Sequence, residues 1–210
     1  LDIGLDQMGR GLDRFMSWGY LPHEDQAQQP TIDGRAATTI MPGGIYDGAA
    51  DQHQEMDQAA VRENTSRAWY DEGAQSVHPF DRYTSPSDKN KRDFSGRYSW
   101  STSVLHDELG RLEVGPLARG LVSSRAADHG WRHHDPLIRD MYRAMGGASV
   151  LLRQFARLHE TVKLYRQAER CLQQFQLDEP WYVKPREQDG QGWGATEAAR
   201  GALAHWLEVR

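Results

Sequence analysis

The longest regular pattern in the sequence runs from residue 150 to residue 175, where apolar side chains recur at steps of three and four residues. Its members are Val150, Leu151, Phe155, Leu158, Val162, Tyr165, Cys171, Leu172 and Phe175. This spacing gathers the side chains into one stripe along a helix. A helix of that length buries its stripe against other long elements, so the pattern predicts a bundle helix.

A second helix is predicted directly before the first. Asp135 suits the N-cap position and Pro136 the first helical position. The apolar stripe that follows consists of Leu137, Ile138, Met141, Tyr142 and Met145. Gly146 and Gly147 should interrupt or kink the helix, because glycine costs roughly 1 kcal/mol in a helix interior.

Residues 1–134 show only short patterns between polar and glycine-rich segments. Helical spacing is present over Asp51–Tyr70, and alternation typical of a strand over Tyr98–Val104. Thr38–Met41 reads as a short strand that ends at the turn signal Pro42–Gly44.

The end of the chain is less regular. Leu117–Val122 could begin a helical turn, residues 178–195 read as a loop, and residues 202–209 fit either a strand or a helix. We predict an α+β, mainly helical fold with long bundle helices, short strands and long ordered loops. We expect a single partial domain over 1–210, with a loop-rich α+β part at 1–134, long bundle helices at 135–177, and a glycine-rich candidate active-site loop and strand at 178–210.

Composition excludes several classes of protein. A formal net charge of −5 and the lack of a basic stripe argue against nucleic-acid binding. No apolar run approaches the ~18 residues of a membrane span. The single cysteine, Cys171, rules out a disulfide framework and any multi-cysteine metal site within these residues. Because the chain opens with Leu1 and not Met, we expect it to be a piece of a longer protein.

Two groups of polar residues are considered separately. His133, His134 and Asp135 make a poor chelate, because adjacent side chains point apart, and a solvated approach to the helix is the favoured interpretation. The run 190–201 embeds one Glu and one Arg among small residues, so backbone can approach a neighbour closely there. That run is either a functional site or a tight turn with a Glu–Arg ion pair.

Two segments carry a specific resemblance. Gly194–Trp206 resembles the E-A-P-R-G-A-L-x-H-W segment of nickel–iron hydrogenase large subunits. Tyr98–Trp100, followed by Leu112–Arg119, resembles the family's Y-S-W and E-V-G-P-L-A-R motifs. Looser matches occur in the expected order at 14–19, 41–45, 66–70 and 78–81. The resemblance therefore covers most of the chain.

The resemblance implies a catalytic subunit that oxidises or evolves H2 heterolytically. Such subunits hold a Ni–Fe centre, with cyanide and carbon monoxide on the iron, through two C-x-x-C pairs, one near each terminus. Neither pair is present here, so we expect an internal segment that is inactive alone. Implied partners are a small subunit with iron–sulfur clusters and a membrane cytochrome or other electron acceptor. A membrane-associated, periplasmic location is implied through these partners, with the cytoplasm as the alternative.

The resemblance also assigns residues. Arg200 would hang its guanidinium over the open position between the metals, either accepting a proton as H2 splits or acting as a fixed positive charge. Glu197 would orient it, and the backbone of Ala199 and Arg200 could donate toward an iron-bound cyanide. Ala199 departs from the family's usual proline. His205 would pack or hydrogen-bond under the site, or relay protons.

Glu113 and Arg119 are interpreted as a buried structural ion pair near Gly115–Pro116, because buried charges are usually paired. After Tyr98–Trp100 the sequence lacks the family's usual I-K-A-P-R continuation. The alternative function is a scaffold or quinone-linked relative of the same fold without a Ni–Fe centre, which would lack the two C-x-x-C pairs. A third hypothesis is a free-standing helical binding module.

Overall fold

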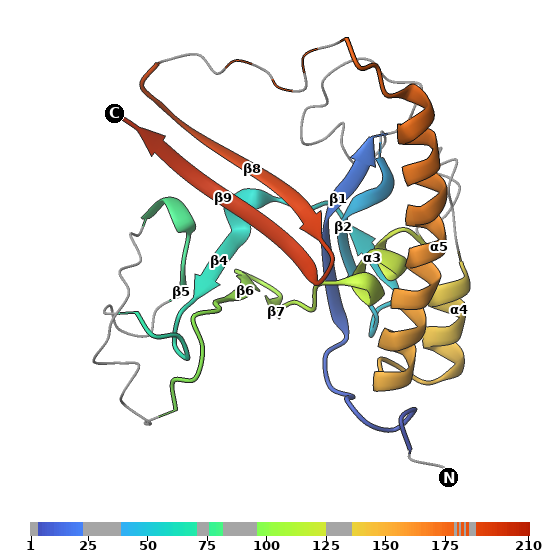
Figure 1. The fold of residues 1–210 in the computed structure, drawn as a ribbon. Helices are drawn as coiled ribbons and strands as arrows, with labels where there is room; N and C mark the ends of the chain where they lie inside the picture. The colour runs from blue at the N-terminus through green and yellow to red at the C-terminus, as the bar shows by residue number, and fades with distance from the viewer. Residues whose placement is uncertain are drawn as a thin grey trace.

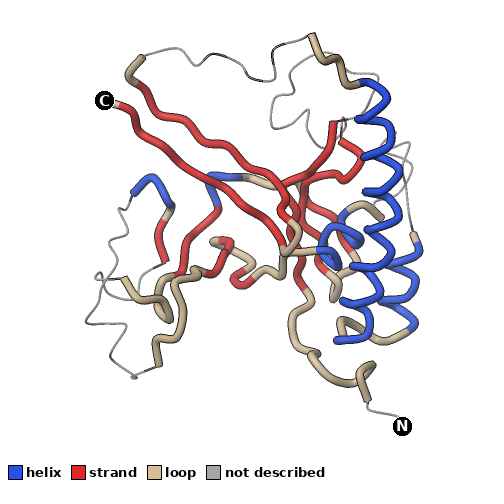
Figure 2. The backbone as a smooth tube through the Cα atoms, viewed as in Figure 1, coloured by secondary structure: helices blue, strands red, loops and turns tan. Residues whose placement is uncertain are grey.

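The computed structural model describes residues 4–22, 39–70, 76–81, 96–124, 136–178, 180, 182, 184 and 188–210. The α-helices gather on one side of the described structure, and most strands lie on the other side together with short 3-10 turns (Figure 2). The predicted His133–Asp135 cluster and the predicted Asp135 cap lie outside the described residues. No helix among the described residues is long and apolar enough to cross a membrane.

The strands form three antiparallel sheets. The first contains β1 (Arg14–Pro22), β2 (Thr39–Asp47) and β3 (Gln52–Gln54). The second has the order β5 (Ser76–Val77), β4 (Val61–Asn64), β6 (Ser103–His106) and β7 (Gly110–Arg111). The third is the hairpin of β8 (Gly190–Ala198) and β9 (Gly201–Val209), which crosses the molecule in Figure 1.

The helices α3 (Pro116–Val122), α4 (Leu137–Ala144) and α5 (Val150–Gln174) pack on one side of the first sheet (Figure 1). Short 3-10 turns η1 (Gln58–Ala60) and η2 (Pro79–Asp81) flank the second sheet. The first core lies between β1, β2 and the helices, and contains Phe15, Tyr46, Leu117, Ala118, Leu121, Val122, Ile138, Tyr142, Ala148, Leu152 and Ala156.

Residues 15–19 of strand β1 are buried on both faces. Phe15 belongs to the helical core, whereas its neighbours Met16 and Trp18 point the other way into a second core with Ile45 and Val61. Successive side chains of a strand point to opposite faces, which explains how one strand serves two cores. The second core also takes in the inner face of the β8–β9 hairpin, and this contact places the hairpin beside β1.

The long helix is confirmed, but its predicted stripe is not its buried face. Ser149 caps α5 by accepting a hydrogen bond from the Leu152 amide at 3.2 Å. Leu152 and Ala156 are buried against the core, whereas Leu158 and Tyr165 are each 70% exposed. The buried stripe is thus the less apolar one, and most of the predicted stripe faces outward, although Phe155 is partly buried against the core.

The shorter helix is also confirmed as α4, separated from α5 by the predicted glycine break. Gly146 and Gly147 have φ values of 66° and 123°, a backbone region that L side chains rarely adopt. The predicted helical turn at Leu117–Val122 is confirmed by α3.

Three local predictions were wrong. Residues 51–70 are not a helix, because β3 and β4 pair with β2 and β6, and tertiary pairing overrides weak helical spacing. Strand β2 runs through Pro42–Gly44, because a Cβ at Gly43 would lie 2.7 Å from the Trp18 carbonyl oxygen, so glycine there permits pairing with β1. Residues 190–195 belong to strand β8 and not to a loop.

The predicted strand over Tyr98–Val104 begins only at Ser103. Residues 202–209, which fit a strand or a helix, form the strand β9. With these changes the described elements hold more residues in strands than in helices, so the prediction of a mainly helical fold was wrong. The division of the chain into three parts stays a prediction.

Candidate functional site

A buried guanidinium lies at the junction of the helices and the hairpin. Arg119 of α3 is 3% exposed, and its Nε and Nη2 donate to the two carboxylate oxygens of Glu160 on α5, at 2.5 and 2.8 Å. This bidentate arrangement fixes the plane of the guanidinium as well as its position.

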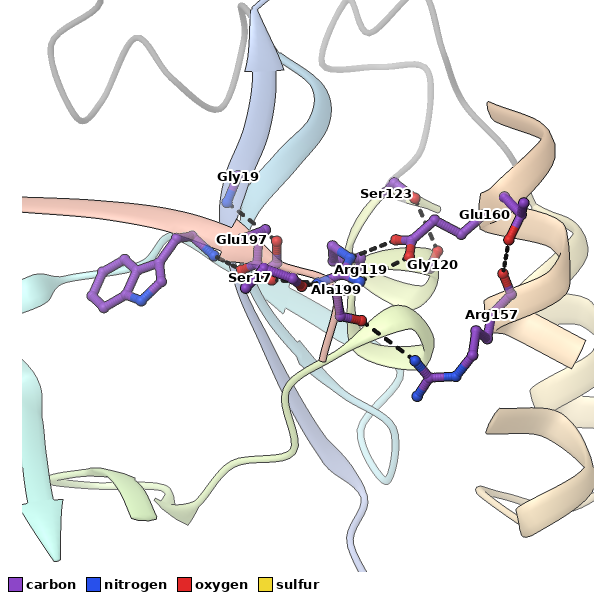
Figure 3. Close-up of polar contacts among 12 residues, drawn as sticks. Ser17, Gly19, Arg119, Gly120, Ser123, Arg157, Glu160, Glu197 and Ala199 are labelled. Atoms are coloured by element: carbon purple, nitrogen blue, oxygen red, sulfur yellow. Dashed lines mark hydrogen bonds and ion pairs between the residues drawn. The ribbon is translucent and has the colours of Figure 1, made fainter. Parts of the chain in front are cut away.

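The remaining terminal nitrogen of Arg119 contacts strand β8. Nη1 donates to Oε2 of Glu197 at 2.7 Å and to the carbonyl oxygen of Ala198 at 2.9 Å. The other carboxylate oxygen of Glu197, Oε1, accepts the Trp18 amide of β1 at 2.7 Å. One buried cluster, defined here as Arg119, Glu160 and Glu197, therefore joins α3, α5, β8 and β1 (Figure 3).

Burial and charge act against each other in this cluster. Burial lowers the pKa of Arg119, but its hydrogen bonds and charge interactions with Glu160 and Glu197 raise the pKa above its ordinary value. Burial raises the pKa of Glu197, while the Trp18 amide and Arg119 oppose that rise. Arg119 therefore stays protonated, and removing it would leave two carboxylates buried without their partner.

The hairpin turn lies directly beyond this cluster. Residues 199 and 200 form the turn between β8 and β9, and Arg200 is exposed there. Its guanidinium forms no hydrogen bond or ion pair with another residue of the described ranges. Its carbonyl oxygen would lie 2.9 Å from a Cβ at Gly115, and a Cβ at Gly201 would lie 2.7 Å from Cγ2 of Val114. The turn is thus seated closely on the residues that precede α3.

The sequence profile of the nickel-dependent hydrogenase family matches residues 4–210. The chain belongs to the nickel-dependent hydrogenases. The family resemblance read from the motifs is therefore confirmed.

Two relatives and two solved structures illustrate the match. The chain is 27% identical to the hydrogenase-1 large chain of Citrobacter freundii, over 97% of this chain and 38% of that one. It is also 27% identical to the periplasmic [NiFeSe] hydrogenase large subunit of Desulfomicrobium baculatum, over 98% of this chain and 38% of that one.

The Ni-Fe-Se hydrogenase of D. vulgaris Hildenborough shares the fold, with a TM-score of 0.72 and 24% identity over 98% of this chain and 41% of that chain. The [NiFeSe] hydrogenase of Dm. baculatum gives a TM-score of 0.68 and 27% identity, over 98% of this chain and 40% of that chain. The hydrogenase chain described here thus spans about two fifths of the proteins it matches.

The structure changes the expected partner of Glu197. The carboxylate contacts Arg119 and the Trp18 amide, so the orienting contact expected between Glu197 and Arg200 is not formed. Strand alternation accounts for this, because Glu197 lies on the buried face of β8 while Arg200 sits in the exposed turn. Ala199 enters the site through its carbonyl oxygen, 3.4 Å from Nη1 of Arg157 (Figure 3).

Glu113 and Arg119 are both paired, but not with each other. Both carboxylate oxygens of Glu113 accept hydrogen bonds from Arg153, from Nε and Nη2 at 2.7 Å each. The backbone of Glu113 bonds to Arg14 and Met16 on β1, which leaves its side chain directed at the start of α5. The predicted single pair is therefore two separate ion-pair sites.

His205 lies on β9 opposite Gly194 and is exposed. It lines a cavity of about 390 Å³ together with residues of β4, β6 and the second core, among them Glu63, Ser103 and Trp206. Its predicted role under the site stays a prediction.

Sequence reasoning missed Glu160, which completes the cluster. Its signal is its spacing: Leu152, Ala156 and Glu160 recur every four residues, and all three are buried. A carboxylate in line with buried helix positions points to a buried partner, and Arg119 is that partner.

The described residues do not supply a metal site. They contain no group of three or more His, Cys, Asp or Glu side chains placed to hold an ion. Cys171, the single cysteine, is exposed on α5 and far from the turn in sequence. The described residues thus do not fit the ligand set of a Ni–Fe centre.

Proposed function

We propose that this chain is part of the catalytic large subunit of a nickel–iron hydrogenase that oxidises or evolves H2. The observation that carries the proposal is the turn with Arg200. It lies in the segment that matches the family's most specific motif, and a buried cluster holds the strand that leads into it, while Arg200 itself is exposed.

The exposed surfaces support a place within a longer subunit. Leu158, Tyr165 and Leu172 form an exposed apolar stripe on α5, with Leu172 77% exposed. Contiguous apolar surface of this kind is normally covered by a partner element. Since the chain spans about two fifths of its relatives, further segments of the same subunit are the natural cover.

In the proposed enzyme a Ni–Fe centre, held by cysteines of those further segments, supplies the chemistry of H2 cleavage. This chain would contribute the Arg200 guanidinium to that site. A guanidinium remains protonated under nearly all conditions, which favours a fixed positive charge and hydrogen-bond donor over a base. Glu197, Ala199 and His205 support the turn and its surroundings.

Electron transfer is proposed to use a small subunit with iron–sulfur clusters and then a membrane cytochrome or another acceptor. One relative is named as a periplasmic enzyme, and we propose the periplasmic side for this protein as well. Copurification of an iron–sulfur subunit with the full-length protein tests the partner directly.

The decisive variant in the full-length enzyme is Arg200→Lys. It keeps the charge but loses the planar fork of donors, so H2 oxidation should fall at least about tenfold while nickel content is unchanged. The matched control is Arg210→Lys at the other end of the same hairpin, which should retain activity. Wild-type turnover by Arg200→Lys would remove the role given to Arg200.

The alternative, a scaffold or quinone-linked relative without a Ni–Fe centre, makes the opposite prediction for the wild-type protein. Metal analysis of the full-length protein separates the two, because the scaffold would purify without nickel and without H2-dependent dye reduction.

A further inference from the structure

We propose that Arg119 is a positioning residue, whose guanidinium ties the turn carrying Arg200 to helices α3 and α5. The inference rests on the proposed function for its consequence on turnover, but not for its structural content. In this proposal the buried ion pairs of Arg119 determine where the turn lies relative to the helical core.

The planar geometry of the Arg119 guanidinium fixes the directions of its hydrogen bonds. Two of its nitrogens are committed to Glu160 in a bidentate pair, which leaves Nη1 pointing in one direction only. Nη1 then makes both of its contacts with β8, at the Glu197 side chain and at the Ala198 carbonyl oxygen. A rigid planar group thus transmits the position of α5 to the last residues before the turn.

The turn between β8 and β9 also packs closely against the residues that precede α3. Glycine at 115 and 201 leaves room for the turn to lie against Val114 and the start of α3. Arg119 lies one helical turn beyond Gly115, and its amide donates to the Gly115 carbonyl oxygen at 2.9 Å. Helix α3 therefore contacts the turn at its start and, through Arg119, also binds strand β8, which leads into the turn.

A second, half-buried ion pair on α5 allows a comparison. Arg153 also forms a bidentate pair, with Glu113, but this pair joins α5 to the segment beside β1, and within the described ranges Arg153 forms no hydrogen bond or ion pair with the hairpin. Loss of Arg153 should therefore weaken the fold without releasing the turn. This difference separates positioning from general stabilisation.

The test uses hydrogen–deuterium exchange of the full-length protein, read on the peptide that contains Ala198 and Gly201, which pair across the turn. Arg119→Lys should speed exchange there about tenfold or more, because an ammonium cannot hold Glu160, Glu197 and Ala198 together. Arg153→Lys, the matched control, should leave exchange of this peptide unchanged. Equal protection of the turn in wild type and Arg119→Lys would overturn the proposal.

A double-mutant cycle tests the consequence for turnover. If Arg119 acts through Arg200, Arg119→Lys should cost about tenfold in H2 oxidation in the wild-type background, but less than about twofold on top of Arg200→Lys. The same loss in both backgrounds would show that Arg119 does not act through Arg200. If Arg200→Lys itself is harmless, the proposed function fails while the exchange result still decides the positioning role.

Glu160→Gln provides a second variant in case Arg119→Lys does not fold. It keeps the shape of the side chain and weakens the bidentate contact, so the turn peptide should exchange faster than in wild type. Unchanged exchange in a folded Glu160→Gln protein would also overturn the proposal.

Discussion

The two ends of the β8–β9 hairpin differ sharply, although one antiparallel ladder joins them from Ala198–Gly201 to Gly190–Val209. At the turn end, Glu197 is buried in an ion pair with Arg119, and Gly201 lies against Val114. At the open end, a Cβ added at Gly190 or Gly192 would meet no atom within 4 Å, and Leu207 is 62% exposed.

The middle of the hairpin lies between these extremes. Trp193 and Trp206 are paired residues of the two strands, with ring centroids 6.2 Å apart, and both rings lie near Trp18 of β1. Trp206 also donates from Nε1 to Gln58 at 3.1 Å. The ladder gives the hairpin its local form, whereas contacts that fade toward the open end determine where it lies. Glycine therefore permits a close approach to a neighbouring segment only at the turn end of the hairpin.

The largest effect is expected where the turn meets the start of α3. Gly115 has φ 117° and ψ −167°, a region essentially reserved for glycine, and a Cβ there would lie 2.9 Å from the Arg200 carbonyl oxygen. Gly115→Ala should therefore lower the free energy of unfolding by about 3 kcal/mol, measured by urea titration.

Gly110→Ala is the matched control for backbone strain. Gly110 also has a positive φ, 72°, but no atom lies within 4 Å of an added Cβ. It should cost only about 1 kcal/mol. Equal losses at the two positions would mean that the close approach of the turn adds nothing to stability.

The sequence predicted the parts of this comparison that depend on local pattern. The helix α5 follows from its own periodicity and the glycine break before it, and the close approach near Arg200 follows from the small residues of its segment. The pairing of β8 with β9 was harder to predict from the sequence. Glycines at 190, 192 and 194 are typical of a loop unless the partner strand is known.

The partners of Arg119 could not be read from local pattern. Glu160 lies 41 residues away and Glu197 lies 78 residues away, so only the packing of three elements brings them together. Glu113 lay closer in sequence and was therefore the predicted partner, but strand-like pairing with β1 directs it to Arg153. A charged residue that is predicted to be buried thus indicates that a partner exists. It does not indicate which residue the partner is.

A smaller loss is expected in the middle of the hairpin. Trp193→Ala removes a half-buried ring 5.7 Å from that of Trp18 and should lower the free energy of unfolding by about 2 kcal/mol, less than for a fully buried ring. Leu207→Ala on the outer face is the control and should change it by less than about 0.5 kcal/mol. If the two variants were equally stable, the aromatic cluster would not hold the hairpin.

The smallest effect is expected at the open end, where Gly192 pairs with Leu207. Its φ lies outside the left-handed region and nothing lies near an added Cβ, so Gly192→Ala reduces the freedom of the unfolded chain without a clash. The urea midpoint should stay constant or rise slightly, by the equivalent of at most about 1 kcal/mol. The same substitution in the full-length protein sharpens the comparison. A loss above about 1.5 kcal/mol there would mean that another segment lies directly on this glycine face, because a methyl group then meets an atom. The open end would then resemble the turn end, with glycine serving close approach at both.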